Sequence, residues 1–141
     1  MQAIYKTTMT STGGRSGSSV SEDGNFTLDL STPKELGGAG GEGTNPEQLF
    51  AAGYSACYIG ALQFVASQQK LKLPAGMQVT ATIGIGENPR GIGFNISADL
   101  IVALPGMDKA AAEKLAEDAH QVCPYSNATR GNIDTSTEVV V

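Results

Sequence analysis

The sequence contains two cysteines, and each stands where a sulfur could react. Cys57 lies in the middle of an apolar, small-residue pattern typical of a helix, and Cys123 ends a second helix pattern directly before Pro124. A buried sulfur within reach of a partner sulfur from far along the chain is what two-step thiol redox chemistry needs. The alternative is that both cysteines merely pack in the core, where free cysteines are common.

A reactive Cys57 needs a positive charge beside it, because burial in apolar surroundings disfavours the thiolate. The sequence has no Lys or Arg between Gly41 and Gln69. The helix N-terminus lies about 15 Å away at the rise of an α-helix, beyond the useful range of its dipole. Arg15, alone in a Gly- and Ser-rich turn, is the outstanding candidate for the cation, although most turn arginines are simply solvated.

Glu47 is the candidate carboxylate of such a site. It lies in the first turn of the same helix, where residues 44–47 read Thr-Asn-Pro-Glu and fit a capping box. Its side chain can therefore cap the helix, or it can hold an arginine in place.

Other motifs carry less. The lone His120, three residues before Cys123, could join the cysteines as a metal ligand, but CxxC and HxxxH spacings are absent, so we predict no metal site. Residues 38–43 match GxGxxG, yet no apolar strand precedes them and Glu42 would repel a phosphate. No cofactor is predicted.

Composition excludes several classes of function. The 141 residues are 40% hydrophobic, which favours one domain over residues 1–141. Nine basic against fourteen acidic residues give a net charge of −5, so nucleic acid and membrane surfaces are not expected partners. The N-terminus lacks the apolar core of a signal peptide, and we expect no transmembrane run and a cytoplasmic protein.

The elements that position these residues follow from hydrophobic periodicity. Strands are predicted over residues 2–8 and 25–31, on either side of the turn that holds Arg15. A loop over residues 32–43 leads into a helix that runs from about Pro46 to Gln69.

The second half of the sequence predicts a hairpin, a helix and a strand. Alternating residues over 77–87 and 92–104 indicate two strands with one buried face. A helix capped by Asp108 is expected to stop at Pro124, and residues 135–141 read as a last strand. The predicted class is α+β.

Three segments together resemble the organic hydroperoxide resistance (Ohr) branch of the Ohr/OsmC family. They are Arg15 in its early Gly/Ser turn, residues 45–57 (NPEQLFAAGYSAC) and residues 123–132 (CPYSNATRGN). The resemblance covers the whole chain. It implies a thiol-dependent peroxidase that reduces organic hydroperoxides to alcohols in the response to oxidative stress, with no metal or prosthetic group.

The resemblance also assigns roles to residues. It implies that Cys57 is the peroxidatic sulfur and Cys123 the resolving one, joined in an intrachain disulfide during turnover, with Arg15 and Glu47 activating the site. The implied reductant is a dihydrolipoyl group on another protein, or another dithiol. Beside this chemistry, the aromatic residues of the first helix are candidates for an apolar wall that binds the organic part of the substrate: Phe50, Tyr54 and Phe64.

The fold implied by the resemblance is an intertwined homodimer, with antiparallel sheets wrapped around central Cys-bearing helices. Glu47 and Cys57 lie about 15 Å apart along one helix, so an arginine held by Glu47 could hardly reach Cys57 of the same chain. Two copies that cross near residues 51–53, which are small, would bring Glu47 of one beside Cys57 of the other. We therefore predict that Arg15 and Glu47 serve the opposite subunit's cysteine.

Two rival functions remain at this stage. The first is a non-enzymatic dimer that senses oxidation or binds apolar ligands, with the cysteines as a switch. The second is an OsmC-type peroxidase with a different substrate preference. Thiol consumption with an organic peroxide separates the first rival from catalysis, and the ratio of organic to hydrogen peroxide turnover separates the second.

Overall fold

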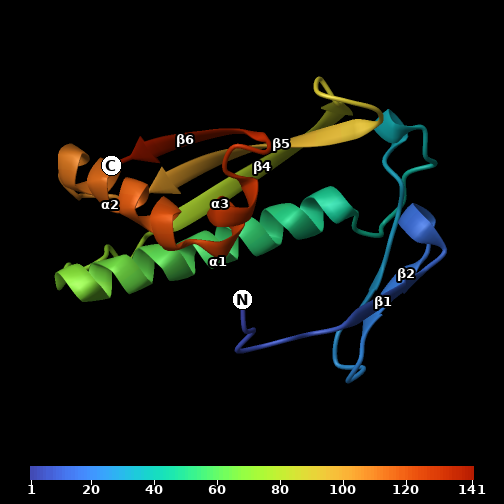
Figure 1. The fold of residues 1–141 in the computed structure, drawn as a ribbon, viewed down its shortest axis with the longest axis horizontal. Helices are drawn as coiled ribbons and strands as arrows, with labels where there is room; N and C mark the ends of the chain where they lie inside the picture. The colour runs from blue at the N-terminus through green and yellow to red at the C-terminus, as the bar shows by residue number, and fades with distance from the viewer. The chain divides into compact units, whose positions relative to one another are not determined.

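The computed structural model describes residues 1–141 and is of the predicted α+β class. The chain divides into two compact units, an N-terminal unit, Met1–Leu49, and a C-terminal unit, Phe50–Val141. Each unit is built around its own three-stranded sheet (Figure 1). That the two units together form a single domain over residues 1–141 stays a prediction.

The N-terminal unit holds an antiparallel sheet in the order β1-β2-β3. Its strands are β1 (Met9–Thr12), β2 (Ser18–Ser21) and β3 (Thr27–Asp29). The strand expected over residues 2–8 is wrong: β1 begins at Met9, opposite Ser21 at the end of β2. β2 was not predicted, because this strand is short and its residues, Ser18–Ser21, are mostly polar.

The turn between β1 and β2 is a short 3-10 helix, η1 (Gly14–Ser16), with Arg15 at its centre. Gly13 has a φ of +71°, a left-handed conformation that side chains rarely adopt. A Cβ added to Gly17 would lie only 1.8 Å from the Thr12 carbonyl oxygen. The glycines flanking Arg15 are therefore required to fold this turn back on itself.

The segment after β3 is a loop, as predicted, apart from the 3-10 turn η2 (Lys34–Leu36). An isolated parallel bridge joins Leu30 to Thr44 at the two ends of the loop. It brings the chain back to the point where the long helix α1 (Pro46–Gln69) begins, within the predicted bounds.

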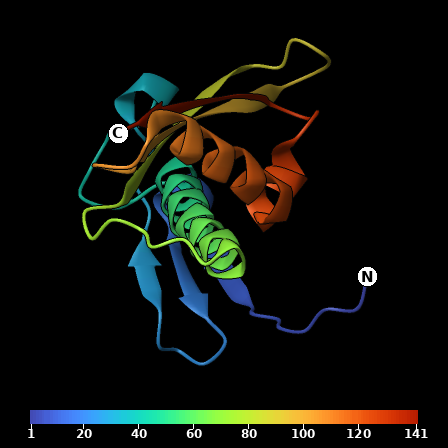
Figure 2. The ribbon, with the colours of Figure 1, turned by 90° about the vertical axis from the view of Figure 1, so that its left-hand side faces the viewer.

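The C-terminal unit holds the second sheet, in the order β4-β5-β6. β4 (Gln78–Glu87) and β5 (Phe94–Ala103) form the predicted antiparallel hairpin, and β6 (Asp134–Val140) is the predicted last strand. β6 pairs parallel to β5, so this sheet is mixed rather than wholly antiparallel. The residues of α1 from Phe50 on lie with α2 (Lys109–Val122) on one face of this sheet (Figures 1 and 2).

α2 begins as predicted, with the Asp108 side chain accepting a hydrogen bond from the Ala111 N–H at 3.0 Å. The chain does not become irregular at Pro124, however. A further short helix, α3 (Pro124–Thr129), starts there, with the proline at its first position and Cys123 as the residue between the two helices. A proline both stops one helix and favours the first turn of the next, and only the first effect was predicted.

One face of α1 forms the centre of the core of the C-terminal unit. Its Tyr58 and Leu62 belong to one buried cluster with side chains of β5, of α2 and of the residue that follows α2: Leu100, Val102, Leu115 and Cys123. The helix carries no charged residue after Glu47 and is long and apolar enough to cross a membrane, so the expectation that no segment reaches that length is wrong. The core helix of a globular unit meets the same criterion, and α1 buries six side chains in this way.

The buried hydroxyl of Tyr58 provides a test of this packing. Tyr58 is fully buried and its Oη donates a hydrogen bond of 2.6 Å to the Ala116 carbonyl of α2. Tyr58→Phe should lower the free energy of unfolding by about 1 kcal/mol, measured in urea. Tyr125→Phe is the matched control: its hydroxyl has no hydrogen bond within the chain, so we expect a change within about 0.5 kcal/mol. Equal losses in the two variants would contradict the packing described here.

Candidate active site

The structure brings the two cysteines together within the C-terminal unit. Cys57 is half-buried on α1 and packs against the core cluster that contains Cys123, which is fully buried between α2 and α3. The two thiols are free, and Cys123 is near enough to raise the pKa of Cys57. The folded chain therefore brings into one neighbourhood two sulfurs that are far apart in the sequence.

The surroundings of Cys57 favour its neutral thiol. Burial raises the pKa of the Cys57 thiol, and the neighbouring Cys123 sulfur raises it further. The backbone of Tyr125, near the start of α3, lowers the pKa in opposition. The net shift is upward, and none of the three influences is a cation. The sequence-based argument that Cys57 needs a positive charge is thus reinforced.

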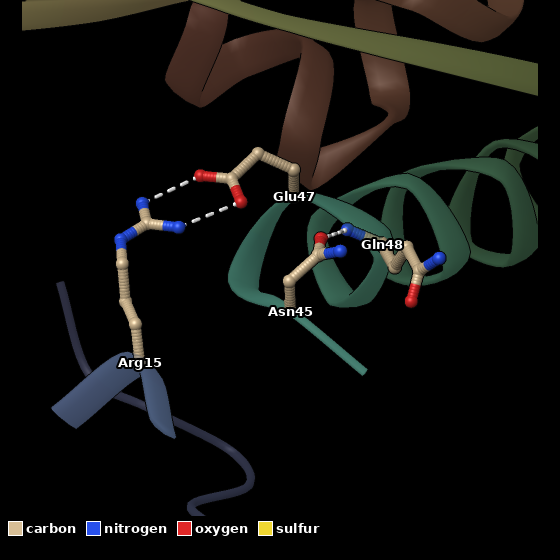
Figure 3. A network of polar contacts seen from close by, with 4 residues as sticks. All are labelled: Arg15, Asn45, Glu47 and Gln48. Atoms are coloured by element: carbon tan, nitrogen blue, oxygen red, sulfur yellow. Dashed lines mark hydrogen bonds and ion pairs between the residues drawn. The ribbon is translucent and has the colours of Figure 1, made fainter. Parts of the chain in front are cut away.

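Arg15 and Glu47 form a bidentate ion pair within the N-terminal unit (Figure 3). Nη1 of Arg15 donates to Oε2 of Glu47 at 2.9 Å, and Nη2 donates to Oε1 at 2.7 Å. The pair lowers the pKa of the Glu47 carboxyl and raises the pKa of Arg15, chiefly through these hydrogen bonds. The Arg15 side chain is 39% exposed against 15% for the Glu47 side chain, and Nη1 and Nη2 of Arg15 are held by the carboxylate.

Glu47 does not cap the helix, because other residues do so. Oδ1 of Asn45 accepts the Gln48 N–H at 2.8 Å (Figure 3). The Thr44 hydroxyl donates to the Gln48 side chain at 2.8 Å. The capping interaction is thus shifted by one residue from the predicted one. Both oxygens of Glu47 remain available for the arginine, and the positive end of the helix dipole favours its negative charge.

An apolar pocket of about 690 Å³ opens beside Cys57. It is lined by Cys57, Gly60, Ala61, Phe64, Val122 and Pro124. Of the three aromatic residues predicted to bind substrate, Phe64 lines this pocket and is 56% exposed. Phe50 lines a separate pocket of about 390 Å³, and Tyr54 is buried in the core with 1% exposure.

Gly53 of α1 has a different role from the one predicted for it. Gly53 was one of three small residues at which two copies were predicted to cross. A Cβ at Gly53 would lie 2.5 Å from Oη of Tyr125, so this glycine makes room for a side chain of its own chain. Ala52, Ala56 and Gly60 are small residues of α1 that lie exposed.

His120 is engaged in hydrogen bonds with hydroxyl groups. Its Nδ1 lies 2.9 Å from Oγ of Ser126, and its Nε2 lies 2.9 Å from Oγ1 of Thr137. Burial, with the Arg130 charge, lowers the pKa of His120. No group of three or more His, Cys, Asp or Glu side chains gathers in the chain. Sequence reasoning missed these hydroxyl partners, because Ser126 lies in α3, which was not foreseen, and Thr137 lies 17 residues away on β6.

Comparison with known proteins gives consistent matches over nearly the whole chain. Residues 38–138 match the family model described as OsmC-like protein. The organic hydroperoxide resistance protein of Xanthomonas axonopodis pv. citri is 58% identical over 135 residues, covering 96% of this chain and 94% of that protein. OhrB of Bacillus subtilis, also named an organic hydroperoxide resistance protein, is 39% identical over 97% of this chain and 98% of its own.

Solved structures agree with the sequence matches. A crystal structure of an organic hydroperoxide resistance protein from Legionella pneumophila superposes with a TM-score of 0.92 at 44% identity, covering 99% of this chain and 100% of that one. A Vibrio cholerae homologue, solved with captopril in one of its active sites, gives 0.90 at 48% identity, with 99% and 94% covered. The chain belongs to the OsmC-like family, within its organic hydroperoxide resistance branch.

Proposed function

We propose that this protein reduces organic hydroperoxides to alcohols through thiol chemistry at Cys57. The observation that carries the proposal is the meeting of two free thiols, Cys57 and Cys123, with Cys57 also lining an apolar pocket. A sulfur that is open to an apolar ligand on one side and to a second sulfur on the other suits a two-step redox cycle. The names of its relatives supply the substrate class.

In the first step, the Cys57 thiolate attacks one oxygen of the hydroperoxide. The S–O bond forms as the O–O bond breaks, and the leaving alkoxide takes a proton to become the alcohol. In the second step, the Cys123 sulfur attacks the sulfur of the Cys57 sulfenic acid, which releases water and forms the intrachain disulfide. A dithiol, which we propose to be a dihydrolipoyl group of another protein, then reduces the disulfide by exchange.

Arg15 supplies the positive charge that the Cys57 site lacks. A guanidinium beside the sulfur would lower the Cys57 pKa against the upward effect of burial, and it would stabilise negative charge on the departing oxygen. Glu47 orients the guanidinium through its two hydrogen bonds and leaves the other donors free. Cys57, Cys123, Arg15 and Glu47 are therefore the proposed catalytic residues.

The apolar pocket beside Cys57 would hold the organic part of the substrate. Phe64 is the predicted wall residue that lines it, so we propose Phe64 as the main substrate contact. For Phe50 and Tyr54 we propose an indirect contribution, since their rings pack edge-to-face against each other on the same helix, α1. An apolar wall favours an alkyl hydroperoxide over hydrogen peroxide. This argues against the second rival function, an OsmC-type peroxidase with a different substrate preference.

We further propose that the protein is a cytoplasmic homodimer. The N-terminal unit buries only Ser19, and it exposes large apolar side chains such as Val20 and Phe26. A unit of this size needs a larger core than that, so a second surface has to cover it. The exposed apolar face of α1 also needs a surface to cover it, and we propose that a second copy of the chain covers both this face and the N-terminal unit.

The two sulfurs should have separable roles. With one equivalent of cumene hydroperoxide, Cys57→Ser should consume no peroxide, because the nucleophile is missing. Cys123→Ser should consume one equivalent and stop as a sulfenic acid, detected as a dimedone adduct by mass spectrometry. Stoichiometric peroxide loss with Cys57→Ser would overturn the assignment. Steady turnover of the wild type with dihydrolipoamide separates catalysis from the non-enzymatic rival.

The proposal that Arg15 and Glu47 serve the opposite subunit can be tested with mixed dimers. Cys57→Ser and Arg15→Ala chains are unfolded together and refolded in equal amounts. If the site is shared, each mixed dimer has one intact centre, and about a quarter of the wild-type activity returns.

The matched control mixes wild-type chains with the Arg15→Ala/Cys57→Ser double variant. In this mixture a shared site leaves every mixed dimer inactive, whereas a site contained in one chain leaves one active centre in each. Inactive mixed dimers in the first mixture and active ones in the second would refute the shared site.

A further inference from the structure

The corner that carries Cys123 is closed by a hydrogen bond between the residues on either side of it. Cys123 ends α2 and caps α3, with an extended backbone conformation (φ −68°, ψ 120°). His120 lies three residues before it and Ser126 three residues after it, and Nδ1 of His120 is 2.9 Å from Oγ of Ser126. This contact spans the bend and fixes the directions in which the two helices leave Cys123.

The same serine joins the corner to the helix that carries Cys57. Oη of Tyr54 lies 3.1 Å from Oγ of Ser126 and 3.3 Å from Oγ1 of Thr129. Tyr54 precedes Cys57 by three residues, so its hydroxyl ties α1 to α3 within one helical turn of each sulfur. The exposed fractions are 1% for Tyr54, 3% for Ser126 and 5% for Thr129, which makes this a buried polar cluster inside an apolar core.

Two further side chains of the CPYSNATRGN segment complete the corner. Nη2 of Arg130 donates to the His120 carbonyl at 2.5 Å, and Nδ2 of Asn127 donates to the Gln121 carbonyl at 3.4 Å. These carbonyls belong to the last turn of α2, where no later N–H of the helix can reach them. The corner is therefore held on its buried side by the hydroxyl and imidazole groups, and on its exposed side by the Arg130 and Asn127 side chains.

Disulfide formation makes strict demands on the position of Cys123. The two sulfurs must approach to about 2 Å with a C–S–S–C dihedral near 90° in either sense. Misplacement of a reacting group by about 1 Å can slow a reaction about a hundredfold. The Cys123 N–H donates to the Ala119 carbonyl and the Cys123 carbonyl accepts the Asn127 N–H, each at 2.9 Å. Its extended backbone is helical in neither direction, however, so the angle between the two helices at Cys123 has to be fixed by side chains.

We propose that Ser126, together with His120 and Tyr54, positions Cys123 for the step that converts the Cys57 sulfenic acid into the disulfide. The proposal rests on the proposed function for the origin of the sulfenic acid. These residues do not touch the peroxide in this account. They act through the placement of the resolving sulfur, so their loss slows the second step and spares the first.

The main variant is Ser126→Ala, which removes the hydroxyl shared by His120 and Tyr54 and changes the side-chain volume little. Reduced protein is mixed with one equivalent of cumene hydroperoxide and quenched at increasing times. Peroxide loss reports the first step, and the intact mass of alkylated protein distinguishes disulfide, sulfenic acid and overoxidised forms. We expect unchanged peroxide loss, disulfide formation slowed by about tenfold or more, and transient accumulation of the Cys57 sulfenic acid.

Thr137→Ala is the matched control, since it removes the other hydrogen-bond partner of His120 and leaves the bond across Cys123 intact. It should form the disulfide at close to the wild-type rate. A pair of His120 variants sharpens the test. His120→Asn places an amide near the position of Nδ1, and His120→Gln places one near Nε2. Faster disulfide formation in His120→Asn than in His120→Gln is expected from positioning and not from general stabilisation of the fold.

An equilibrium measurement separates this proposal from the proposed function. The Cys57–Cys123 disulfide is equilibrated with reduced and oxidised glutathione, which requires no peroxide chemistry. Ser126→Ala should shift the equilibrium toward the dithiol by about tenfold, and Thr137→Ala should not. If the wild type forms the disulfide with glutathione but never with a hydroperoxide, the proposed function fails alone. If Ser126→Ala matches the wild type in both the rate and the equilibrium, the positioning proposal is refuted.

Discussion

The central constraint in this protein is the free-energy cost of forming a thiolate at Cys57 in apolar surroundings. Cys57 lies in a helix that has no charge after Glu47, and both burial and Cys123 raise its pKa. The chain therefore cannot both pack this helix into a core and activate its cysteine with groups from the same core. We propose that the activating charge comes from a different part of the protein, namely Arg15 on the glycine-bounded turn of the N-terminal unit.

The same constraint explains how the two ends of the proposed chemistry are divided. In the proposed chemistry Arg15, which Glu47 holds through two hydrogen bonds, serves the first step. Cys123 is fully buried in the C-terminal unit, and the hydrogen bond between His120 and Ser126 spans the bend that carries it. The proposed activation and the proposed resolution therefore depend on different elements, which allows each to be tested separately.

The sequence predicted the strongly periodic elements, whereas the roles assigned to the reactive residues stay predictions. The bounds of α1 and the Asp108 cap of α2 agree with prediction, because their signals are local. The strand over residues 2–8 was wrong because a strand exists only where a partner strand faces it, and β2 ends opposite Met9. α3 was missed because Pro124 was interpreted only as a stop. The link from Tyr54 to Ser126 joins residues 72 positions apart, and no local pattern reveals it.

The most direct test is the pH dependence of Cys57 alkylation. Iodoacetamide rates are measured from pH 5 to 10 in the Cys123→Ser background, so that Cys57 is the only thiol. Arg15→Ala is compared with Arg90→Ala, which removes the same charge from the turn between β4 and β5. The account predicts that Arg15→Ala raises the pKa of Cys57 by about one unit or more, whereas Arg90→Ala leaves it unchanged. Identical profiles for Arg15→Ala and the parent would contradict the claim that Arg15 activates this cysteine.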